Sequence, residues 1–157
     1  MKNINYIIAT FFYCGYFPFA PGTFASLVAG LLGYFILLEA NYLTLVAVFF
    51  IITIAGFLTS GIIENYENKE DPSIVVIDEA SGILVSMLIV GFFYENYFLN
   101  FILSFVFFRF YDITKFFPVN KMEKIKGGSG IMLDDIVAGI MAGVSVLIIV
   151  FIAGKIK

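Results

Sequence analysis

Long apolar runs separated by short polar segments are the first feature of this 157-residue sequence. A helix that crosses a bilayer needs roughly 20 mainly apolar residues. Residues 3–38 carry no charge, but Pro18 and Pro21 divide this stretch into two pieces. The first piece, residues 4–14, is too short to cross a membrane, so we predict a short re-entrant or interfacial helix there.

Four or five spanning helices are predicted after this segment. They are residues 24–38, 43–63, 80–94, 97–111 and 135–153. Thr23 is well placed to cap the first of them, because threonine is a favoured residue at helix starts. Gly139 and Gly143 in the last helix are four residues apart, which lets a neighbouring helix pack closely. The predicted fold class is an all-α polytopic membrane bundle, with residues 1–157 forming one domain.

The composition agrees with a membrane protein and excludes several kinds of chemistry. Hydrophobic residues make up 61% of the chain and charged residues 13%, whereas soluble domains average about 25% charged residues. The net charge of −3 and the lack of a basic tract argue against nucleic acid as a partner. The chain has no histidine and only Cys14 as a cysteine, which excludes imidazole chemistry, an internal disulfide and a thiolate zinc site.

The distribution of lysines predicts the orientation of the bundle. The predicted loop before the last helix contains Lys115, Lys121, Lys124 and Lys126. Cytoplasmic loops of membrane proteins carry an excess of Lys and Arg, so we expect this loop on the cytoplasmic side. Counting helices back places the turn at residues 18–23 and the loop at residues 64–77 on the same side.

Three segments on that side carry most of the unusual charge. They contribute Asp78, Glu79, Arg109, Asp112, Lys115, Asp134 and Asp135. Taken one at a time, each acidic pair could simply favour a helix N-terminus through the macrodipole, and Arg109–Asp112 could be a structural ion pair. Taken together they favour a polar site, because ionisable groups at membrane depth are costly and are usually functional.

The residue types at this predicted site suit phosphate chemistry with a metal ion. A carboxylate cluster without histidine suits a hard cation such as Mg²⁺, which prefers oxygen ligands. Arginine and lysine beside it suit an anion, and arginine can bind a phosphate with two parallel hydrogen bonds. The backbone N–H groups around Gly128 and Gly130 could approach an oxyanion, although a flexible linker has the same composition. These features together indicate metal-assisted phosphoryl chemistry on a lipid.

Four sequence blocks carry a resemblance to a known family. They are GYFPFAPGTFASL at residues 15–27, VVIDEASG at 75–82, FRFYDITKFFPV at 108–119 and GGSGIMLDDIVAG at 127–139. In their order and spacing the chain resembles the phosphatidylglycerophosphatase A family of bacterial membrane enzymes. One departure is that the family usually has Lys-Pro-x-Pro where this chain has Lys115-Phe116-Phe117-Pro118. A looser turn after the third block is therefore expected.

The resemblance implies Mg²⁺-dependent hydrolysis of the terminal phosphomonoester of phosphatidylglycerophosphate, at the cytoplasmic face of a bacterial inner membrane. The products would be phosphatidylglycerol and phosphate, within phospholipid biosynthesis. The carboxylates expected to hold Mg²⁺ are Asp78, Glu79, Asp134 and Asp135. Asp112 either joins them or orients Arg109.

The substrate is expected to lie against both cations and three neutral donors. Arg109 and Lys115 would hold the phosphate, with Thr23, Gly128 and Gly130 as the neutral donors. Without histidine, one of the five carboxylates must act as general base or nucleophile, and both alternatives stay open.

Two other classes of protein compete with the enzyme. A small ion- or proton-coupled transporter would place its acids near the middle of helices, whereas these lie at predicted helix ends beside loops. A non-catalytic membrane subunit would use the same charges only to pair with a partner, and its purified chain would show no turnover. Membrane lipid is the expected partner in the enzyme reading, and the oligomeric state stays open.

Overall fold

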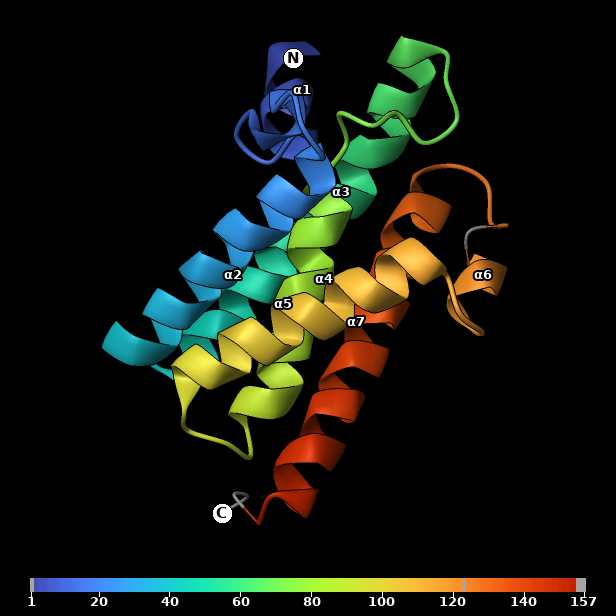
Figure 1. Cartoon of the computed structure of the whole chain (residues 1–157). Coiled ribbons are helices and arrows are strands. Elements are labelled where there is room, and N and C mark those ends of the chain that lie inside the picture. Colours follow the sequence, from blue (N-terminus) through green and yellow to red (C-terminus); the bar gives the residue numbers. More distant parts are fainter. Residues whose placement is uncertain (1, 123, 155–157) are drawn as a thin grey trace.

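A computed structural model describes residues 2–122 and 124–154. Within these residues all regular structure is helical, as the apolar runs predict (Figure 1). The elements are α1 (Lys2–Ala9), the 3-10 helix η1 (Cys14–Tyr16), α2 (Pro21–Glu39), α3 (Tyr42–Glu67), α4 (Ile77–Gly91), α5 (Tyr97–Thr114), α6 (Val119–Met122) and α7 (Gly128–Ile152).

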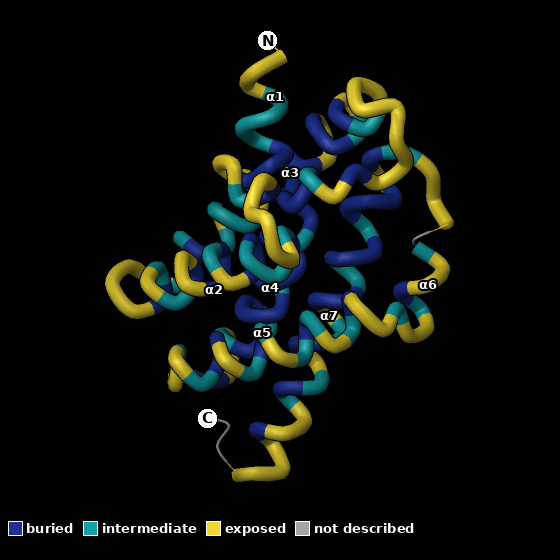
Figure 2. The backbone as a smooth tube through the Cα atoms, turned by 45° about the horizontal axis from the view of Figure 1, so that its top comes forward, coloured by how far each residue is buried: buried dark blue, intermediate teal, exposed yellow. Residues whose placement is uncertain are grey.

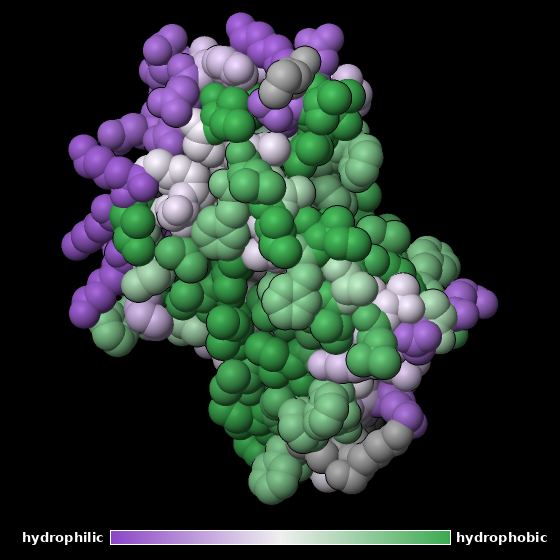
Figure 3. Space-filling model, turned by 180° about the vertical axis from the view of Figure 1, so that it is seen from behind, coloured by the Kyte–Doolittle hydropathy of each residue, from purple (hydrophilic) through white to green (hydrophobic). Residues whose placement is uncertain are grey.

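Four of the described helices, α2, α3, α5 and α7, are long and apolar enough to cross a membrane. Figure 3 shows apolar side chains in a continuous band across the molecule, with hydrophilic residues gathered toward its ends. The prediction of a polytopic helical membrane protein is confirmed. The helix predicted at residues 80–94 is α4, which has 15 residues and is therefore about 22 Å long, shorter than the ~30 Å hydrocarbon core.

The short helix α4 lies at the centre of the bundle, where it packs against α2, α3, α5 and α7. Most of its residues are buried, and Figure 2 shows it dark blue among helices with exposed outer faces. Its approach to α7 is close because glycine faces glycine. A Cβ added to Gly139 would overlap the backbone oxygen of Gly82. The predicted close packing of the last helix is confirmed, and it brings the start of α4 against α7.

Side chains from α5 and α3 add hydrogen bonds near the end of α4. Asn100 donates from Nδ2 to the carbonyl oxygen of Met87 at 3.1 Å. The hydroxyl of Tyr42 donates to the carbonyl oxygen of Leu88 at 3.3 Å. The carbonyl oxygen of Leu88 also accepts a hydrogen bond from the backbone N–H of Phe92 at 3.2 Å. The side chains of Asn100 and Tyr42 therefore add to the backbone hydrogen bonds and tie the end of α4 to α5 and α3.

The N-terminal segment is a short helix followed by tight turns, not one helix over residues 4–14. Helix α1 ends at Ala9, and Phe11, Phe12 and Tyr13 then adopt positive φ angles of 45°, 54° and 69°. The backbone oxygen of Ala9 accepts a hydrogen bond from the backbone N–H of Val76 at 3.0 Å. The segment therefore supports the loop that leads into α4.

Three predicted helix starts were too late by three residues or more. Helix α4 begins at Ile77 instead of residue 80, which places Asp78 and Glu79 in its first turn.

Helix α2 begins at Pro21 with Ala20 as its N-cap, so Thr23 is the third helical residue and not the cap. Proline suits the first position of a helix because its fixed φ is already helical and its missing N–H would have no partner there. Helix α7 begins at Gly128, seven residues before the predicted start at 135. The glycines that resemble a linker are helical because Gly128 packs against the backbone of Gly61.

Candidate active site

The first turns of α2 and α4, the end of α5 and the second turn of α7 meet at one end of the bundle (Figure 1). A cavity of about 310 Å³ lies between them. All seven charged side chains singled out from the sequence line it, namely Asp78, Glu79, Arg109, Asp112, Lys115, Asp134 and Asp135. The structure therefore brings together charges from three segments that are far apart in the sequence.

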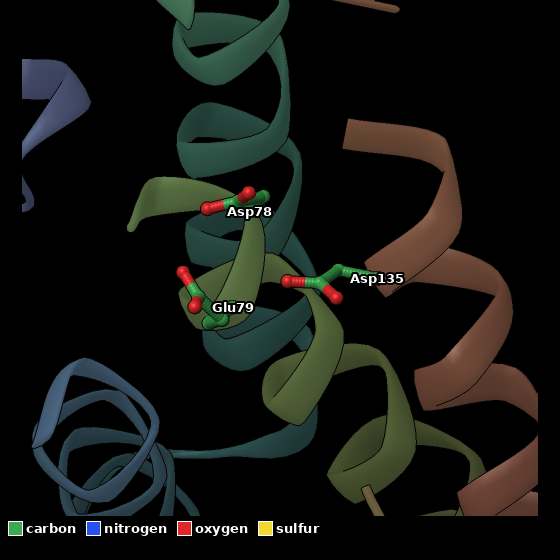
Figure 4. Close-up of side chains that lie close together, drawn as sticks. All are labelled: Asp78, Glu79 and Asp135. Atoms are coloured by element: carbon green, nitrogen blue, oxygen red, sulfur yellow. The ribbon is translucent and has the colours of Figure 1, made fainter. Parts of the chain in front are cut away.

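Asp78, Glu79 and Asp135 form a carboxylate triad, and Figure 4 shows Asp135 projecting from α7 toward the first turn of α4, which carries Asp78 and Glu79. Each residue offers one oxygen, and these oxygens lie within 4.8 Å of one another. Among the described residues, Asp78 Oδ1 and Glu79 Oε2 are buried and have no hydrogen-bond partner. A buried carboxylate without a partner is costly, and a hard cation with oxygen ligands would compensate all three.

Arg109 lies beside the triad and is held by an acid one turn along α5. Its Nη1 atom is 2.5 Å from Asp112 Oδ2 and 3.9 Å from Glu79 Oε1. Its Nε atom is buried and has no hydrogen-bond partner in the described part of the chain. Of the two roles predicted for Asp112, this placement matches orientation of Arg109. The guanidinium keeps a donor available for an anion in the cavity.

Lys115 occupies the other flank of the triad, at the C-cap of α5. Its Nζ atom is 2.5 Å from Asp134 Oδ2 and 3.3 Å from Asp112 Oδ1. Burial by itself would lower the pKa of Lys115, but the negative charges of Asp135, Asp134 and Asp112 raise that pKa overall. Lys115 is therefore a cation at neutral pH. Lys115 therefore reaches the cavity although this chain has Phe116 at the position where the resemblance leads us to expect a proline.

The two neighbouring acids of α7 have different surroundings. Asp135 belongs to the triad, whereas Asp134 forms an ion pair with Lys115. Adjacent residues on a helix point about 100° apart, which separates the two carboxylates. The placement of Asp134 therefore differs from that expected of a metal ligand.

Three predicted substrate donors lie outside the lining of this cavity. Thr23 follows its lining residues Pro21 and Gly22 but is not one of them. Gly128 packs against α3, and Gly130 lines a neighbouring cavity of about 280 Å³. A Cβ on Gly130 would overlap the backbone oxygen of Ile125, so tight packing accounts for this glycine.

Six further residues line the cavity, and sequence reasoning assigned a site role to none of them: Ala20, Pro21, Gly22, Asp71, Ser73 and Val75. A Cβ added to Gly22 would overlap Glu79 Oε1, so the absence of a side chain at Gly22 leaves room for the Glu79 carboxylate. Gly22 could have been found from the sequence, because it lies in the block GYFPFAPGTFASL that carries the family resemblance. Asp71 also lines the cavity, although its sequence surroundings are typical of a solvated loop.

The fold and the cavity describe a helical membrane protein in which a carboxylate triad lies between two cations, an arrangement that suits an anionic group together with a metal ion. Residues 7–150 match the family described as phosphatidylglycerophosphatase A. The chain therefore belongs to the phosphatidylglycerophosphatase A family, and it is a phosphatase.

Named relatives cover nearly the whole chain. A Bacteroides thetaiotaomicron protein named "Putative phosphatidylinositol-3-phosphatase" is 36% identical over 152 residues, which are 94% of this chain and 94% of the relative. Phosphatidylglycerophosphatase A of Haemophilus influenzae is 31% identical, covering 95% of this chain and 90% of the relative. Phosphatidylglycerophosphatase A of Escherichia coli is 30% identical, covering 90% and 81%. No solved structure matches the chain.

Proposed function

We propose that this protein hydrolyses the terminal phosphomonoester of phosphatidylglycerophosphate to give phosphatidylglycerol and phosphate, as a Mg²⁺-dependent step of phospholipid biosynthesis. The observation that carries the proposal is the triad of Asp78, Glu79 and Asp135, whose oxygens lie within 4.8 Å of one another between Arg109 and Lys115. The family membership and the two relatives named phosphatidylglycerophosphatase A support the choice of lipid.

The charge of the cavity supports a role for a divalent cation. Six carboxylates and two cations line it, so the formal charge of its walls is −4 when all of them are ionised. Such a cavity would repel a phosphomonoester unless cations entered with it. The triad fits Mg²⁺ because its ligands are all oxygens and two of its oxygen atoms lack hydrogen bonds among the described residues. When bound, Mg²⁺ supplies charge neutralisation at phosphoryl oxygens and lowers the pKa of a coordinated water.

The remaining charges bind and orient the phosphate. Arg109 and Lys115 flank the triad and can donate charge-assisted hydrogen bonds to phosphate oxygens. Asp112 and Asp134 hold these two cations in place, which preorganises the site. The proton lost by an attacking water must go to a carboxylate, because the chain has no histidine. Since Asp112 and Asp134 are engaged by cations, the triad is the favoured source of that base.

The lysines around the site support a cytoplasmic location in a bacterial inner membrane. Lys115 lies in the cavity, and Lys124 and Lys126 line the neighbouring one. Lys and Arg accumulate in cytoplasmic loops, so this end of the bundle faces the cytoplasm. Lipid headgroups made on that side would reach the cavity without crossing the bilayer.

The test is phosphate release by the purified protein in lipid nanodiscs. Phosphatidylglycerophosphate and phosphatidylinositol 3-phosphate are compared as substrates, each with Mg²⁺ and with EDTA. We expect Mg²⁺-dependent release, faster from phosphatidylglycerophosphate, and a loss of at least about 10²-fold in Asp135→Asn. Glu39→Gln, at the exposed last residue of α2, is the matched control and should keep full activity.

Three outcomes would contradict parts of this proposal. Faster release from the inositol lipid would reassign the substrate. Full activity of Asp135→Asn would remove the triad from the mechanism. No release by folded protein from either lipid would favour a transporter or a non-catalytic subunit.

A further inference from the structure

We infer that the acyl chains of the substrate lie between the diverging ends of α2 and α5, so that the lipid reaches the cavity sideways from the bilayer. The faces concerned carry Thr23 and Leu27 on α2 and Phe105 and Arg109 on α5, and we call them the α2/α5 seam. The inference rests on the proposed function, because it requires a lipid phosphomonoester in the charged cavity.

Helices α2 and α5 touch at the end that is remote from the cavity. The rings of Tyr34 and Phe98 have centroids 6.0 Å apart, and a Cβ on Gly30 would lie 2.6 Å from Phe101 Cε2. From this contact the two helices separate toward the cavity, and α4 is visible between them (Figure 1). The cavity lies at the open end, where Pro21 and Arg109 line its two sides.

The faces of α2 and α5 that contact each other continue along both helices to the cavity. On α2, Tyr34 and Gly30 share a face with Leu27 and Thr23, because steps of three and four residues return to one side of a helix. On α5 the same steps lead from the residues at the contact to Phe105 and then to Arg109. Leu27 is 39% exposed and Phe105 is partly buried, so the seam offers apolar surface below a cationic end. This order of groups matches a phospholipid, which is anionic at the head and apolar in the tails.

The size of the cavity requires the tails to leave it. A volume of about 310 Å³ suits a headgroup, whereas an acyl chain spans about half of the ~30 Å hydrocarbon core. The neighbouring cavity shares Asp71 and Asp134 with this one and is lined by charged side chains, which are unsuitable for hydrocarbon. The α4–α7 contact is closed by Gly82 and Gly139. The α2/α5 side offers the exposed apolar surface that these two directions lack.

Exposed phenylalanines mark both edges of the open end. Phe19 precedes α2 and is 79% exposed, and Phe117 follows α5 and is 65% exposed. Phe110 and Phe116 lie close together on the α5 side, with ring centroids 5.7 Å apart. Large apolar side chains at these edges suit contact with lipid more than contact with water. Phe19 is next to Ala20 and Phe116 is next to Lys115, and both of these neighbours line the cavity. Exposed apolar side chains therefore adjoin the cavity on the α2 side and on the α5 side.

Photo-crosslinking tests the path of the chains without depending on turnover. The probe is a phosphonate analogue of phosphatidylglycerophosphate with a diazirine on one acyl chain, bound in nanodiscs with Mg²⁺. The reference is phosphatidylcholine with the same acyl diazirine. We expect the phosphonate to label peptides of α2 and α5 around Leu27 and Phe105 in excess over the reference. Arg109→Gln should remove this excess.

Two tryptophan variants test whether a large side chain in the α2/α5 seam excludes the acyl chains. Leu27→Trp should reduce the excess labelling by about tenfold, which corresponds to about 1.4 kcal/mol of binding free energy. Ile51→Trp, on a 67% exposed lipid-facing position of α3, should leave it unchanged. Thermal denaturation of both variants checks that each is folded.

The outcomes separate this inference from the proposed function. Excess labelling on α3 or α7, or equal labelling by the two lipids, would overturn the seam whatever the activity of the protein. Excess labelling of the seam by a protein that releases no phosphate would keep the seam and overturn the enzymatic proposal.

Discussion

Replacement of Gly22 by alanine tests whether the position of the Glu79 carboxylate sets the activity. Gly22 is buried in the first turn of α2, and a Cβ at this position would overlap Glu79 Oε1. Ordinary contacts of a Cβ atom are 3.4–4 Å, so the carboxylate must move or α2 must shift. The change adds one methyl group and alters no charge, so any loss of activity reports on geometry.

The size of the effect follows from this overlap. Relief needs a movement of more than ~1 Å, and misplacement of a catalytic group by ~1 Å already costs about 10²-fold in rate. A 10²-fold loss corresponds to about 2.7 kcal/mol of transition-state stabilisation. Folding should suffer much less, because replacing a helical glycine by alanine is itself favourable by roughly 0.5–1 kcal/mol. We therefore expect a folded and nearly inactive variant.

The assay is kcat/KM for phosphate release in nanodiscs, together with the melting temperature. Gly33→Ala is the control on the same helix, because its Cβ would meet only the ends of flexible side chains, Leu84 Cδ2 at 3.0 Å and Met87 Sδ at 3.1 Å. It should keep most of the activity. The double variant Gly22→Ala/Glu79→Asp shortens the carboxylate and should recover part of the loss. Full activity in Gly22→Ala would refute the reasoning, because Glu79 would then not need its present position.

Further predictions concern the cation pair, the helix packing and the end of α4. Lys115→Met should lower kcat/KM by about 10²-fold while Mg²⁺ binding measured by calorimetry stays equal or tightens, because a cation competing for the acids is removed. Gly139→Ala should lower the melting temperature and the activity more than Gly143→Ala, since the first meets a backbone oxygen and the second a side chain. Asn100→Ala should lower the free energy of unfolding in detergent by about 1–2 kcal/mol, because the buried hydrogen bond between α5 and the backbone of α4 is lost.

The membrane fold was predictable because length and hydropathy are nearly sufficient to identify spanning helices. The exceptions have local physical causes. Helix α4 contains only 15 residues, and the end of the helix is held by hydrogen bonds from Asn100 and Tyr42 of other helices. The first turn of α7 depends on the contact of Gly128 with Gly61. Contacts between distant segments are not encoded in the periodicity of either segment, so the boundaries they determine could not be predicted.

The gathering of the charges was also predictable, whereas their pairing was not. Topology alone places the acids of α4 and α7 at the same end as Arg109 and Lys115. The choice of partners depends on helix rotation and on side-chain reach, which adjacent acids in a sequence do not reveal. Gly22 was missed for a related reason, since its importance comes from the space it leaves for Glu79.

The pairing gives the adjacent acids of α7 separate functions. Asp134 faces Lys115 and Asp135 faces the triad, because neighbouring positions on a helix differ by about 100° in direction. Asp112 does for Arg109 what Asp134 does for Lys115, so each cation has its own aspartate within 2.5 Å. The cations are thereby fixed at the flanks and are kept from neutralising the triad fully. One cavity can therefore hold positive charge for the phosphate and negative charge for a metal ion. Asp112 and Asp134 fix the two cations, and the triad carboxylates stay available for the metal ion.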